Sequence, residues 1–166
     1  PIGQALVVEV GGEPVVVAEA DRPLYHAALA HGANHLVVLV AQAAQALVAA
    51  GVEKGDRVLE PLLSAALDSA LRAAGTVGGR AGEGARGTVG AVAGLTGPVV
   101  RGDARTVAAH LRELAALAGR EPDAADLPGS YRVLARSATT RALAGGRIGL
   151  DQAQQLLDVL SDGTGE

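Results

Sequence analysis

Three histidines and an asparagine lie near the start of a stretch without Asp, Glu, Lys or Arg, residues 23–52. His26 and Asn34 are eight residues apart, which on a helix means about 80° in direction and ~12 Å along the axis. Both could therefore line one cleft without touching. A histidine there could be the general acid in reduction of a carbonyl or an imine, and the asparagine could orient the substrate. A structural role for both residues is the open alternative.

His31 and His35 are four residues apart and so share a helix face, the spacing that many zinc-binding helices use. No acidic residue lies between or near them, the chain has no cysteine, and the remaining histidines are His26 and His110. We therefore expect no metal site. The simpler interpretation is a polar helix end that packs against neighbouring loops.

The tripeptide Arg101-Gly102-Asp103 could form an anion site. Asp103 can cap the helix that follows, Gly102 permits the turn, and Arg101 stands beside a helix N-terminus whose free N–H groups attract anions. A substrate carboxylate or phosphate could bind there. Arg101 could equally be an ordinary surface residue.

The element that carries the histidines is expected to be one long helix over residues 23–52, with Asp21 as its N-cap and Gly51 as its end. Thirty residues would span roughly 45 Å, and the apolar block from Leu36 onward is hydrophobic on every side. Such a helix needs a partner subunit, another domain, or both. The uncharged length would also cross a bilayer, but six polar side chains and the lack of Lys/Arg flanks argue against a membrane.

Periodicity predicts further helices over about residues 56–74, 103–119, 130–144 and 151–160, with Leu134, Ala138 and Ala142 facing inward in the third of these. Residues 3–10 could form a helix or a strand, and the valine-rich residues 13–18 predict a β-strand. A glycine-rich loop is expected over residues 75–94. Its segment 82–87 (GEGARG) matches the dinucleotide fingerprint GxGxxG, but a helix precedes it instead of a strand, so we expect no cofactor binding in this chain.

Composition limits the classes of function. The chain has 166 residues, 49% of them hydrophobic, and a formal net charge of -4, which is typical of a soluble globular protein with a real core. An acidic balance and an aromatic fraction of 1% argue against nucleic-acid binding. Without cysteine there is no disulfide and no thiol nucleophile. No secretory signal precedes the first helix, so we expect a cytoplasmic protein.

Five segments occur in an order that resembles a known family: residues 25–28 (YHAA), 33–35 (ANH), 60–63 (EPLL), 95–103 (LTGPVVRGD) and 131–135 (YRVLA). They resemble the helical C-terminal domain of a bacterial family of Rossmann-like proteins that end in a domain of unknown function. The resemblance covers about residues 13–144. Its most specific parts are the TGPxxRGD and YHAA segments.

That family is similar to ketopantoate reductase, pyrroline-carboxylate reductase and 6-phosphogluconate dehydrogenase. In that group a Rossmann domain binds NADP, and an all-helical domain completes the substrate cleft and dimerises. The resemblance implies a mainly α, multi-helix fold like the C-terminal domain of 6-phosphogluconate dehydrogenase, over residues 21–162. Residues 1–20 would be a short αβ remnant of the Rossmann-like domain.

The resemblance also implies roles for single residues. His26 and Asn34 occupy places comparable to the catalytic residues of that group, where lysine is common in place of His26. Tyr25, Thr96, Arg101 and Asp103 would then bind the substrate.

The expected function is therefore the dimerisation and substrate-cleft domain of an NADP-dependent oxidoreductase that acts on a small molecule. The chain begins near the end of the expected Rossmann-like domain, so NADP is implied for the full-length protein and not for this chain. The expected partners are a second copy and that missing domain. The alternative is a non-enzymatic helical oligomerisation or protein-interaction module, in which the site residues scatter and do not converge.

Overall fold

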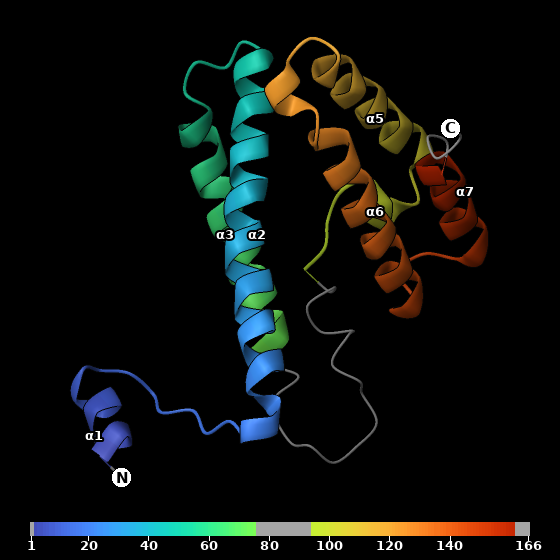
Figure 1. Cartoon of the computed structure of the whole chain (residues 1–166). Helices are drawn as coiled ribbons and strands as arrows, with labels where there is room; N and C mark the ends of the chain where they lie inside the picture. Colours follow the sequence, from blue (N-terminus) through green and yellow to red (C-terminus); the bar gives the residue numbers. More distant parts are fainter. Residues whose placement is uncertain (1, 76–93, 162–166) are drawn as a thin grey trace. The chain divides into compact units, whose positions relative to one another are not determined.

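The computed structural model describes residues 2–75 and 94–161, and every regular element in these two ranges is a helix (Figure 1). The mainly α class predicted from the sequence is therefore confirmed. The chain divides into two compact units, residues 1–41 and residues 42–166. The boundary falls inside one long helix, and each unit is described by itself.

The first unit contains α1 (Ile2–Glu9), a 3-10 turn (Glu19–Asp21) and most of α2 (Arg22–Ala49). The β-strand predicted over residues 13–18 is wrong, because residues 12–18 adopt no regular structure. A strand satisfies its backbone N–H and C=O groups only through a neighbouring strand, and the described residues offer none. Residues Ile2–Glu9 are helical, which is one of the two alternatives predicted for residues 3–10.

The long helix α2 (Arg22–Ala49) begins one residue before the helix predicted over residues 23–52 and ends three residues before its predicted end. It begins at Arg22, directly after Asp21, and places Pro23 in its first turn. At its end Gly51 adopts a positive φ of 86°. The N–H of Val52 donates to the Leu47 carbonyl at 2.9 Å and the N–H of Gly51 donates to the Val48 carbonyl at 2.9 Å. These two bonds form a Schellman motif, which satisfies carbonyl groups left open at the helix end.

Within the single chain, the apolar side chains of α2 in the first unit are largely uncovered. Leu24 is 72% exposed, Leu29 is 53% exposed and Val37 is 68% exposed. The segment Glu19–Ala49 is long and apolar enough to cross a membrane by length and composition, a test that core helices of soluble proteins also pass. Its sequence predicts a helix surrounded by others, and the described part of this chain does not surround it.

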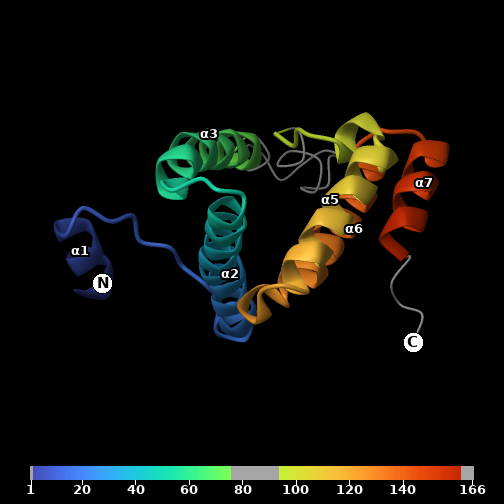
Figure 2. The same cartoon turned by 90° about the horizontal axis from the view of Figure 1, so that it is seen from above.

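The second unit contains α3 (Gly55–Gly75), α5 (Ala104–Ala118), α6 (Leu127–Ala144) and α7 (Leu150–Ser161), with short 3-10 turns at Val99–Arg101 and Pro122–Ala124. All four predicted helices are therefore present. Helices α5, α6 and α7 pack against one another (Figure 2). Their shared core consists of small and aliphatic side chains: Val107, Leu111, Ala135, Ala142, Ile148, Ala153, Leu156 and Leu160.

The buried face of α6 differs from the predicted one. Leu134 is 46% exposed, whereas its neighbour Ala135 is buried, as are Thr139 and Ala142. Consecutive helical residues point about 100° apart, so the core-facing stripe is shifted by one position at Leu134 and Ala138, whereas Ala142 is buried as predicted. Small side chains along this stripe allow α6 to pack closely against α5 and α7.

The last two turns of α2 belong to the second unit and are tied to α6 by a polar contact. The buried amide of Gln42 donates to Asp126 Oδ2 at 2.8 Å and to Ser130 Oγ at 2.9 Å. Nearby, Ala46 packs against a small apolar cluster of Leu117, Ala124 and Leu127. The C-terminal end of α2 therefore has a defined place in this unit.

Candidate functional site

Asp103 is the N-cap of α5, as its sequence predicts. Its Oδ1 accepts a hydrogen bond from the backbone N–H of Thr106 at 3.0 Å, and its Oδ2 accepts one from the Thr106 hydroxyl at 2.6 Å. The hydroxyl bond and then the backbone bond of Thr106 lower the pKa of the Asp103 carboxyl, and the positive charges of Arg101 and Arg105 add to this effect. The carboxylate is therefore ionised at neutral pH.

The turn before α5 is held in place by α7. Gly102 adopts a left-handed conformation with φ of 68°, and its N–H donates to the Val99 carbonyl at 3.0 Å. A Cβ atom at Gly102 would lie 2.3 Å from Nε2 of Gln152 and 2.9 Å from its Cβ. Gln152 Nε2 also donates to the Arg101 carbonyl at 3.4 Å. Glycine is thus required here by its conformation and by the close approach of α7.

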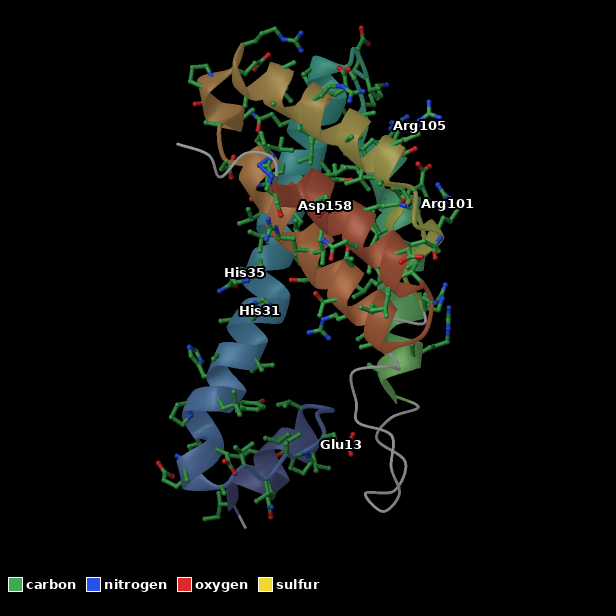
Figure 3. All side chains as sticks on the ribbon, turned by 90° about the vertical axis from the view of Figure 1, so that its right-hand side faces the viewer. Glu13, His31, His35, Arg101, Arg105 and Asp158 are labelled. Carbon is green, nitrogen blue, oxygen red and sulfur yellow. The ribbon has the colours of Figure 1, made fainter. Side chains whose placement is uncertain are left out.

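Two arginines, Arg105 and Arg112, help to line an open hollow along the first turns of α5. The hollow has a volume of about 540 Å³ and is lined, among the described residues, by Asp103, Arg105, Thr106, Ala108, Ala109 and Arg112. Arg101 and Arg105 are both exposed and extend outward near the start of the helix (Figure 3). Neither they nor Arg112 form an ion pair within the described ranges. Unpaired guanidinium groups beside a helix N-terminus can hold a carboxylate or a phosphate.

Sequence reasoning found Arg101 and Asp103 but missed Arg105 and Arg112. The signal was present in part, because Arg105 and Arg112 are seven residues apart within α5, whereas Arg101 precedes that helix. An interval of seven residues brings two side chains to one side of a helix. Thr96 is exposed in the segment that leads into the same turn.

Tyr25, His26 and Asn34 all lie on α2 and are exposed, with Tyr25 at 45%. None of the three makes a side-chain hydrogen bond with any described residue. They belong to the first unit, whereas Thr96, Arg101 and Asp103 belong to the second. The convergence of His26 with Arg101 stays a prediction.

Two further histidine contacts occur. His110 Nδ1 lies 2.9 Å from the Tyr131 hydroxyl and joins α5 to α6, and burial raises the pKa of the Tyr131 phenol. On α2, His31 Nδ1 lies 2.9 Å from His35 Nδ1. The described residues contain no group of three or more His, Cys, Asp or Glu side chains that could enclose a metal ion. The GxGxxG match at residues 82–87 lies outside the described residues.

Comparison with known proteins places the chain in a family. A family model described as a domain of unknown function (DUF2520) matches residues 1–138. No curated protein and no solved structure matched the chain. The match covers most of the sequence, and it agrees with the domain of unknown function in the resemblance described above. The chain belongs to the DUF2520 family.

Proposed function

We propose that this chain is the helical part of an NADP-dependent oxidoreductase, in which it forms a homodimer and one side of the substrate cleft. The observation that carries the proposal is the exposure of α2, whose apolar side chains the described part of this chain does not cover. The order of the YHAA, TGPxxRGD and YRVLA segments and the mainly α fold support it further.

Covering α2 would contribute a substantial free energy of association. Burial of an exposed leucine or valine side chain contributes about 1.5–3 kcal/mol, and Leu24, Leu29 and Val37 are each more than half exposed. The same helix exposes Tyr25, His26 and Asn34. A subunit or domain that covers the apolar side chains of α2 would therefore also lie beside these polar ones and close a cleft over them.

We propose separate tasks for the residues. His26 would donate a proton to the oxygen or nitrogen of the group being reduced, and Asn34 would orient it. Arg101, Arg105 and Arg112 would bind an anionic group of the substrate. Asp103 is engaged by Thr106 and ionised, so it positions the start of α5 and does not act as an acid.

NADP would be bound outside the described part of this chain. The pyrophosphate site of a dinucleotide-binding domain needs a strand, a glycine-rich turn and a helix, and the described residues contain no strand. We therefore expect no measurable NADP affinity for the chain alone. A Rossmann-like domain joined to it would supply the hydride donor.

The test is kinetic and uses the complete gene product that contains this chain. NADPH binding is measured first, followed by NADPH oxidation with small carbonyl and imine compounds that carry a carboxylate or phosphate. His26→Ala should then lower turnover by about 10²- to 10⁴-fold, and Arg101→Ala should raise KM for the anionic substrate. His31→Ala is the matched control, because its side chain lies about 140° around α2 from that of His26.

The opposite result would favour the alternative function. A folded, dimeric gene product that binds no NADPH would contradict the oxidoreductase proposal. It would leave a helical oligomerisation module, for which the exposed α2 is sufficient.

A further inference from the structure

One ring nitrogen of His31 and one ring nitrogen of His35 approach each other closely on an exposed face of α2. Their Nδ1 atoms are 2.9 Å apart. The ring centroids are 4.8 Å apart and the planes are perpendicular. Figure 3 shows both side chains on the same side of α2, one turn apart.

This separation is the one that a metal ion requires of two ligands at a right angle. Imidazole nitrogens bind first-row metal ions at about 2.0–2.1 Å, which puts two ligands about 2.9 Å apart at 90° and about 3.4 Å apart at the tetrahedral angle. Right-angle coordination by nitrogen ligands is typical of Cu²⁺ and Ni²⁺. The distance between the two Nδ1 atoms thus matches that between adjacent ligands of a square-planar or octahedral ion.

The surroundings permit a cation to bind. Residues 23–52 contain no Lys or Arg, so no neighbouring positive charge on the helix repels it. A metal ion would replace the hydrogen bond between the two rings, and this exposed bond adds little stability. In the sequence, the absence of a third ligand argues against a metal site at His31 and His35. It does not exclude a site whose other positions are open to water.

We propose that His31 and His35 form a two-histidine chelate for Cu²⁺ or Ni²⁺, with the remaining coordination positions open to water or to a small ligand. The bound ion would cross-link one turn of α2. Because it would bind the paired histidines of the helical form more tightly than the unfolded chain, it would stabilise that segment. The proposal is independent of the oxidoreductase function.

The test uses tag-free protein and the metal ions alone. Titration with CuCl₂, followed by electron paramagnetic resonance, should show one Cu²⁺ per chain with coupling to two nitrogen nuclei. His31→Ala and His35→Ala should each remove this signal, whereas His26→Ala and His110→Ala should keep it. Circular dichroism should show that all four variants fold, because the four histidine side chains are exposed.

The melting temperature provides a second test of metal binding. Ni²⁺ should raise the melting temperature of the unaltered chain and leave that of His31→Ala unchanged. Absence of stoichiometric Cu²⁺ uptake by the unaltered chain would overturn the proposal. Equal uptake by His31→Ala and His35→Ala would overturn it as well, and so would displacement of bound Ni²⁺ by equimolar Zn²⁺.

Discussion

Gly102 shows how one residue shapes the start of α5. Its φ of 68° is costly for any side chain, and a Cβ atom would collide with Gln152 of α7. We expect Gly102→Ala to lower the free energy of unfolding by about 1–2 kcal/mol from the backbone conformation alone. Urea denaturation followed by circular dichroism measures the change.

The matched control is Gly129→Ala. Gly129 lies in α6, and a Cβ atom there would meet nothing within 4 Å. Alanine in a helix is favoured over glycine, so this variant should be as stable as the original or more stable by up to about 1 kcal/mol. Equal effects of the two substitutions would show that α7 does not hold the turn.

Asp103 should make the stability of the second unit depend on pH. Its pKa is lowered in the folded chain by the two hydrogen bonds from Thr106. A carboxyl with a lowered folded pKa stabilises the fold above its unfolded pKa of about 4, and this contribution is lost as the pH falls through the folded pKa.

Replacement of Asp103 by alanine tests this dependence. At neutral pH Asp103→Ala should lower the melting temperature by on the order of a few degrees, and the difference should disappear in strong acid. Asp123→Ala is the control, because the Asp123 side chain makes no hydrogen bond to any described residue. A difference in melting temperature between Asp103→Ala and the original chain that persists in strong acid would contradict the role of Asp103 as the N-cap of α5.

Several site residues could be predicted from the sequence because their roles are local. Asp103 precedes a periodic apolar run, and glycine at 102 marks a turn, so cap and turn follow from residue type and spacing. Arg105 and Arg112 were missed, although their spacing places them on one side of α5, because no local rule distinguishes a binding arginine from a surface one. The meeting of His26 with Arg101 depends on contacts far apart in the sequence, which spacing alone does not encode.

At the scale of the elements, Gln42 anchors the last turns of α2. Its buried amide donates to Asp126 and Ser130. Gln42→Ala should lower the free energy of unfolding by about 1–3 kcal/mol, because one of the lost bonds is to a carboxylate. Urea denaturation checks this value. Gln45→Ala on the same helix should have little effect, since Gln45 makes no side-chain hydrogen bond within the described ranges.

The helices were predictable because each has its own start and stop signals. Gly51 and Gly146 have positive φ values of 86° and 67° and follow the last turns of α2 and α6. The strand over residues 13–18 failed because a strand needs a partner that local sequence does not reveal. Leu134 was predicted on the wrong face of α6. The helix carries both alanines and leucines at helical spacing, and the sequence alone does not show which of the two rows faces the core.

At the scale of the whole molecule, both units expose large apolar side chains. Leu29 and Val37 in the first unit are uncovered, and Leu62 and Leu71 on α3 of the second unit are each 63% exposed. Monomeric proteins rarely leave long apolar helix faces in water. We therefore expect the chain to function as an assembly, with a second copy covering α2.

The direct test of this account is sedimentation equilibrium of the unaltered chain at micromolar concentration. We expect a dimer with twice the chain mass of 16.5 kDa, and Leu39→Asp should dissociate or unfold it because a buried unpaired carboxylate is costly. Val133→Asp is the control, since Val133 lies on α6 and not on α2, the helix that the second copy is expected to cover. A folded, stable monomer of the unaltered chain at these concentrations would contradict the account.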